Sequence, residues 1–172
     1  MENQTLQQLF VDILRDMYSC ERQLVTFLPE VINAVSLKEL KETIQKHLVE
    51  TQNQVRRIEK IFSIIGCNAT ENTCEAMQGM VQETRELVKT FTRSPVLDAA
   101  IIAAAQKIEH YEIATYGTLK SFAKQLDFES EVVDLLQDSL DEEGAADKKL
   151  TKIAEGSFFS SGVNREAATS RR

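Results

Sequence analysis

Apolar residues recur every three or four positions along most of this chain of 172 residues, which is the period of one face of an α-helix. The first stripe predicts a helix from about residue 5 to residue 34. Pro29 lies inside this stretch and is expected to kink the helix or end it early. A second stripe, from Leu40 to Phe62, predicts another long helix. The segment Ser36–Glu39 has the form of a capping box that would open it, and Gly66 is suited to end it.

Three further helices are predicted after this point. A shorter one is expected over about residues 74–91. Ser94 and Pro95 fit the N-cap and the first position of a fourth helix. After a short break, the last helix runs to about residue 155. We therefore expect one all-α domain over residues 1–155 and a polar, flexible C-terminal tail over residues 156–172.

The composition narrows the class of protein. Asp and Glu number 27 against 20 Lys and Arg, and the resulting net charge of −7 argues against nucleic acid as a partner. No apolar run reaches the ~18 residues of a membrane span and the N-terminus lacks a signal-peptide pattern, so we expect no membrane partner. The spacing of Cys20, Cys67 and Cys74 fits no zinc motif. Reduced thiols and a cytoplasmic location are therefore expected.

Each of the four long predicted helices carries a glutamate inside its apolar stripe. These residues are Glu21, Glu50, Glu112 and Glu143. Burying a lone carboxylate costs several kcal/mol. Four of them near the helix midpoints therefore indicate a shared cation. The alternative is that each acid is paired with Lys or Arg, or with another of the four.

The spacing also predicts how these helices are arranged. In each predicted hairpin the two glutamates lie at similar distances from the intervening loop, so they are level when the helices are antiparallel. The connection over residues 67–93 is long enough to cross the length of a bundle, which would place the two hairpin loops at opposite ends. This is the ferritin-like four-helix bundle, here with an additional short crossover helix, and it brings the four carboxylates to one central plane.

Three more candidate ligands are displaced from this plane by about one helical turn, all toward the same end: His47, Glu109 and Asp147. Two stacked layers of ligands could hold two metal ions about 3.5–4 Å apart. A set of mostly carboxylate ligands suits hard ions such as iron or manganese. Glu142 stands beside Glu143, and the sequence leaves open which of the two is the ligand.

Several segments resemble the YciF/YciE-like bacterial stress-associated proteins: Tyr18–Gln23, His47–Thr51, Cys74–Met77, Ala104–Ala114 and Leu140–Glu143. The resemblance covers about residues 5–155. It implies a ferritin-like fold, distantly related to rubrerythrins and bacterioferritins, and a dimer. Ferritin-type sites carry Glu-x-x-His on two helices, whereas Asn53 and Ala146 stand at those histidine positions here. Ferroxidase or peroxidase activity therefore does not transfer directly.

These observations lead to two hypotheses. In the first, the protein is a cytosolic di-metal carboxylate protein of the stress response, with two iron or manganese ions and a small oxidant, dioxygen or a peroxide, as substrate. No catalytic residue is assigned. In the second, it is a metal-free structural helical dimer without enzymatic activity. A homodimer through the first two helices is expected because apolar residues remain off their main stripes: Leu9, Leu14, Val25, Val31, Ile61 and Ile65.

Overall fold

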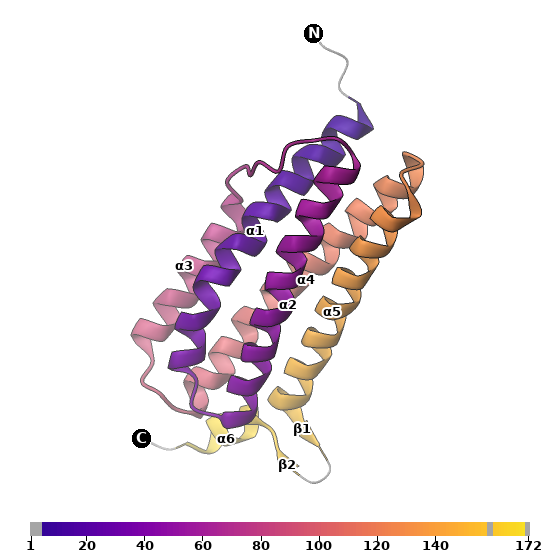
Figure 1. The fold of residues 1–172 in the computed structure, drawn as a ribbon. Coiled ribbons are helices and arrows are strands. Elements are labelled where there is room, and N and C mark those ends of the chain that lie inside the picture. The colour runs from indigo at the N-terminus through magenta and orange to yellow at the C-terminus, as the bar shows by residue number, and fades with distance from the viewer. Residues whose placement is uncertain (1–4, 158–159, 171–172) are drawn as a thin grey trace.

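The computed structural model describes residues 5–157 and 160–170. Five helices of 16 to 31 residues account for most of them, which confirms the predicted all-α class (Figure 1). Their bounds are α1 (Leu6–Ala34), α2 (Lys38–Ile64), α3 (Glu75–Thr90), α4 (Pro95–Gln125) and α5 (Ser130–Glu155).

The four long helices pack side by side, and α3 lies outside them. α1 packs against α2 and α4, and α5 packs against α4 and α2. α3 contacts α1 and α4. Figure 1 shows the α1–α2 loop and the α4–α5 loop at opposite ends, because the connection that contains α3 runs the length of the molecule. Residues near the middle of α2, α4 and α5 consequently lie at one level.

The start of α4 agrees with its sequence signal, whereas the start of α2 does not. Ser94 accepts a hydrogen bond from the backbone N–H of Leu97, and Pro95 is the first residue of α4. α2 has no capping box. Instead, the carboxylate of Asp98 accepts hydrogen bonds from the backbone N–H groups of Ser36 and Leu37, at 2.8 and 2.9 Å. A residue of α4 thus caps α2, and it ties the two hairpins together.

Of the two predicted helix-ending residues, Pro29 does not end its helix and Gly66 does. α1 continues through Pro29 to Ala34, so the proline does not end the helix early. α2 ends at Ile64, and Gly66 follows with a φ angle of +70°, a conformation that glycine adopts at little cost. The predicted stop at Gly66 is therefore confirmed.

The segment expected to be a polar tail is structured where it is described. Gly156–Ser157 (β1) pairs antiparallel with Ser160–Ser161 (β2), and Val163–Thr169 forms the short helix α6. α6 packs against α4 and α5, with Val163 buried. Gly162 approaches the backbone so closely that a Cβ atom there would lie 2.3 Å from the carbonyl oxygen of Ala154. A single buried apolar residue gives no periodicity, which explains why the sequence pattern missed this element.

The apolar residues that suggested a dimer interface are largely internal. Leu14, Val31 and Ile61 belong to the core and are at most 5% exposed. Leu9, at 47%, is the exposed one of the set on α1. Leu14, Val31 and Ile61 are therefore not part of an exposed apolar patch, and the prediction was wrong for these three residues.

Candidate metal centre

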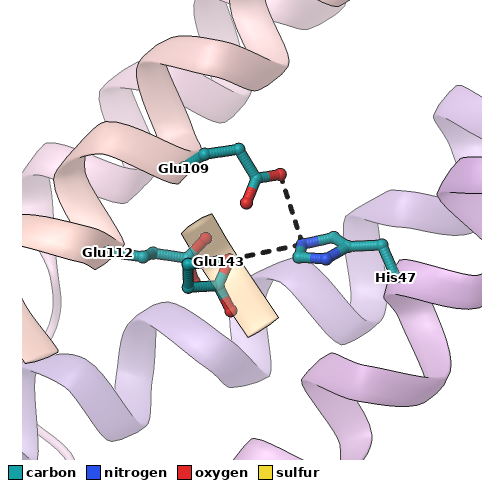
Figure 2. Close-up of side chains that lie close together, drawn as sticks. All are labelled: His47, Glu109, Glu112 and Glu143. Carbon is teal, nitrogen blue, oxygen red and sulfur yellow. Dashed lines mark ion pairs between the residues drawn. The ribbon is translucent and has the colours of Figure 1, made fainter. Parts of the chain in front are cut away.

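A group of four buried side chains gathers at the middle of the helices. His47 comes from α2, Glu109 and Glu112 from α4, and Glu143 from α5 (Figure 2). One possible ligand atom from each lies within 4.8 Å of the others. The spacing of three residues between Glu109 and Glu112 places both carboxylates on one face of α4.

The imidazole of His47 faces two of the carboxylates. Its Nε2 atom lies 3.5 Å from an oxygen of Glu109 and 4.0 Å from an oxygen of Glu143. The thiol of Cys20 lies 3.8 Å from an oxygen of Glu112 and donates to it. The two contacts of His47 are long for hydrogen bonds between nitrogen and oxygen, so the group is close together without being internally satisfied.

Most of the buried polar atoms that lack a partner among the described residues belong to this region. They include the Nδ1 atom of His47 and one carboxylate oxygen each of Glu21, Glu109, Glu112 and Glu143. A buried polar atom without a partner costs about 1–3 kcal/mol, and more when it is charged. Glu109, Glu112 and Glu143 lie close enough together to share one cation, which would offset this cost.

The carboxyl groups also shift one another's acidity. Burial raises the pKa of Glu21, Glu109 and Glu112 well above the usual range, and the nearby carboxylate of Glu143 raises each further. Like charges this close disfavour ionisation. Without a cation, Glu21, Glu109 and Glu112 therefore hold protons at a pH where exposed carboxyl groups have lost theirs.

Glu21 lies beside the group of four. It is fully buried on α1 and accepts a hydrogen bond from the hydroxyl of Tyr116 on α4. Its charge contributes to the raised pKa of both Glu109 and Glu112. Helices α1, α2, α4 and α5 thus each supply at least one polar residue to this centre.

Glu50 and Asp147 lie outside the group. The side chain of Glu50 is 18% exposed, pairs with Lys46, and comes no nearer to His47 than 3.9 Å, at Nδ1. Asp147 accepts a hydrogen bond from Gln106 at 3.1 Å, and His110 lies 3.6 Å away. The group therefore combines residues from both predicted layers. It leaves out Glu50 and Glu21 of the first layer, although Glu21 lies beside it, and Asp147 of the second.

The choice between the neighbouring acids of α5 is clear in the structure. Glu143 is fully buried and faces His47. Glu142 forms a two-point ion pair with Arg57, with distances of 2.6 and 2.8 Å. Glu143 is thus the member that belongs to the buried group.

Sequence reasoning missed Gln54. Its side chain is fully buried and its amide donates to Glu143 and, at 3.1 Å, to Glu142. Together with His47, Thr51 and Ile58 it forms the inward face of α2. Steps of four, three and four residues are a helical stripe, so the signal was present but its polar members obscured it.

Comparisons with known proteins support the resemblance. The family DUF892, described as a domain of unknown function, matches residues 5–168. Protein YciF of Escherichia coli (strain K12) is 40% identical over 155 residues, which cover 90% of this chain and 93% of that protein.

Two solved structures are similar as well. The crystal structure of the E. coli stress protein YciF has a TM-score of 0.83 at 39% identity, covering 88% of this chain and 94% of that one. YcfI from Rhodopseudomonas palustris, provisionally described as a structural protein, has a TM-score of 0.85 at 38% identity, covering 89% and 97%. Among the described residues, no helix is long and apolar enough to cross a membrane.

Proposed function

The chain belongs to the DUF892 family, and we propose that it is a ferritin-like carboxylate protein whose buried centre binds iron or manganese. The observation that carries this proposal is the set of unpartnered atoms at the centre. Five side chains each bury a donor or acceptor atom with no partner among the described residues. Proteins rarely leave buried polar atoms unpaired unless water or an ion completes them.

The donor set favours particular ions. Carboxylate oxygens with one imidazole nitrogen suit iron and manganese, whereas zinc and copper sites more often recruit thiolates or several imidazoles. Glu21 adds a further carboxylate beside the group of four. Five side chains with eight carboxylate oxygens among them provide enough ligands for two ions, the number that the sequence predicted.

The protein's own residues would hold this ligand set in place. Gln54 donates to Glu143, and Tyr116 donates to Glu21. Such contacts fix the orientation of a ligand and commonly change metal affinity 10- to 100-fold. An iron or manganese pair would supply redox chemistry toward dioxygen or a peroxide. A role in the stress response is supported by the stress protein YciF as a relative.

A second candidate function is a metal-free structural dimer. It is favoured by the same hydrogen bonds, since Gln54 and Tyr116 satisfy one oxygen of Glu143 and of Glu21 without any ion. The provisional structural description of YcfI points the same way. In this alternative, protons in place of a cation neutralise the buried acids. A homodimer through α1 and α2 is compatible with both functions.

Metal content separates the two functions. Protein purified without added metal should contain iron or manganese, and chelator-stripped protein should bind Fe(II) or Mn(II) when these are returned. Binding at a hundredfold excess over Kd stabilises by about 2.7 kcal/mol. For a domain of this size that raises Tm by roughly 5–10 °C. A stripped protein whose Tm stays unchanged at millimolar metal would support the structural alternative.

Variants on α4 and α5 make this test specific. The double substitution Glu109→Gln and Glu143→Gln removes two carboxylates of the group and should abolish the rise in Tm. Asp141→Asn is a matched control, because Asp141 is exposed and lies one helical half-turn before Glu143. It should leave the rise intact.

A further inference from the structure

An apolar cavity of about 40 Å³ adjoins the candidate metal centre. It lies on the side of the centre nearer the α1–α2 loop, between residues of the four long helices and α3. His47 and Glu109 form part of its wall. The cavity is thus continuous with two of the proposed ligands.

The rest of the wall offers no free polar group. Seven of the lining residues are large and apolar: Phe27, Leu28, Val31, Ile44, Ile101, Ile108 and Leu150. The hydroxyl groups of Thr43 and Thr84 donate to carbonyl oxygens of their own helices, at 2.8 Å each. They therefore satisfy their hydrogen bonds within the helix instead of in the cavity.

The polar atoms of the wall that lack partners lie at the end of the cavity next to the metal centre. One oxygen of Glu109 and Nδ1 of His47 are buried and unpartnered. At the outer side, the lining residues Ala105 and Ala146 are small and only half-buried. The cavity thus leads from a thinly covered part of the surface, through apolar walls, to the two unpartnered ligands.

We propose that this cavity admits dioxygen to the metal centre and binds it before it reacts. The oxidant of the proposed metal protein is then dioxygen. The inference rests on the proposed function for its biological meaning. Dioxygen is small and apolar, and it loses little on leaving water. Peroxide and superoxide are polar or charged, and passage through apolar walls would cost them their hydrogen bonds.

The size of the cavity excludes larger substrates. An apolar cavity of about 150 Å³ accommodates benzene, whereas this one has about 40 Å³. A molecule of two heavy atoms fits, and an organic hydroperoxide does not. Reduction of one dioxygen to hydrogen peroxide takes two electrons, which two Fe(II) ions would supply on becoming Fe(III), and two protons, which would come from water.

Xenon tests the cavity without any metal. The chelator-stripped protein should bind xenon at this position, seen as a concentration-dependent ¹²⁹Xe shift or as density in a crystal under xenon pressure. Ala146→Leu fills the space and should abolish binding. Ala145→Leu adds the same side chain at an exposed neighbouring position and should not. If Ala146→Leu unfolds the chain, Ala105→Val gives a smaller obstruction from α4.

The second arm compares oxidants in the Fe(II)-loaded protein. Ala146→Leu should slow Fe(II) oxidation by dioxygen about tenfold, because a close-packed interior offers few other routes. The rate with added hydrogen peroxide should change less than the rate with dioxygen. Equal slowing with both oxidants, or no xenon in the wild-type cavity, would overturn the inference.

The outcomes also keep the two proposals apart. If the protein binds metal but no xenon enters the cavity, only the proposed route for dioxygen is overturned. If xenon enters the cavity but the protein binds no metal, the proposed function is overturned, and with it the role of the cavity in admitting dioxygen.

Discussion

The hydroxyl group of Tyr116 on α4 donates a hydrogen bond to the carboxylate of Glu21 on α1, and both side chains are fully buried. Substituting Tyr116→Phe would leave both oxygens of Glu21 without a donor. Losing one partner of a buried pair costs about 1–3 kcal/mol. We therefore expect urea unfolding of the metal-free variant to show a loss of that size.

The control for this variant is Tyr18→Phe. Tyr18 is also a core tyrosine, but its hydroxyl donates to Glu59, which is exposed. Water can replace this donor, so the loss should be at most about 1 kcal/mol. Equal losses for the two variants would contradict the view that Glu21 depends on Tyr116.

The metal-free protein should lose stability as pH rises. Burial and the charge of Glu143 raise the pKa of Glu109 and Glu112 in the folded state. The unfolded chain releases these protons near pH 4.3, and the folded chain retains them to higher pH. Their contribution is therefore fully present below about pH 4.3 and is lost as pH rises through the folded values.

Unfolding free energies of chelator-treated protein between pH 5 and pH 8 would measure this loss. The double variant Glu109→Gln and Glu112→Gln should have a flatter profile than the wild type, because its amides do not titrate. Bound metal should reverse the trend, since it binds the ionised carboxylates more tightly as pH rises. A wild-type profile parallel to that of the double variant would contradict the prediction.

Asp98 should be important for stability although it is remote from the centre. Its carboxylate accepts from the backbone N–H groups of Ser36 and Leu37. Substitution Asp98→Ala removes these charge-assisted bonds and leaves both N–H groups without a cap. We expect a loss of about 2–4 kcal/mol in urea unfolding. Asp134→Ala, at an exposed position of α5, should change stability by less than about 0.5 kcal/mol.

The proposed dimer can be tested at Leu9. Leu9 is 47% exposed, so Leu9→Glu should weaken association while the fold remains stable. Light scattering should give a dimer for the wild type and a smaller mass for the variant. Phe91→Glu is the control, because Phe91 is exposed at the end of α3, outside the expected interface. A wild type that is monomeric at about 100 μM would contradict the prediction, since an interface of standard size survives at that concentration.

Periodicity was sufficient to predict the helices, because each long helix buries one stripe of apolar residues against the others. It also indicated the buried acids Glu21, Glu112 and Glu143, which interrupt those stripes. It failed at Glu50. Positions 47, 51, 54 and 58 face inward on α2, and Glu50 lies at the edge of that face, where Lys46 pairs with it.

The other differences arise from contacts between distant segments. Ser36 and Glu39 have the spacing of a local capping box, but a carboxylate from α4 takes its place. Pro29 is a local signal for an early end, and α1 nevertheless continues to Ala34. In both cases the neighbouring sequence describes a preference that packing overrides.

The cap of α2 has a consequence for how the chain is made. Asp98 follows Ser36 by 62 residues, so the ribosome synthesises all of α2 before its cap exists. A nascent chain that ends within α3 exposes these amides to water, and its first hairpin gains the cap only after α4 has emerged. Truncated products therefore lack both the anchor of α2 and the ligands of α4 and α5. The first hairpin is therefore not completed by its own residues, because the acceptor for these two amides comes from the second.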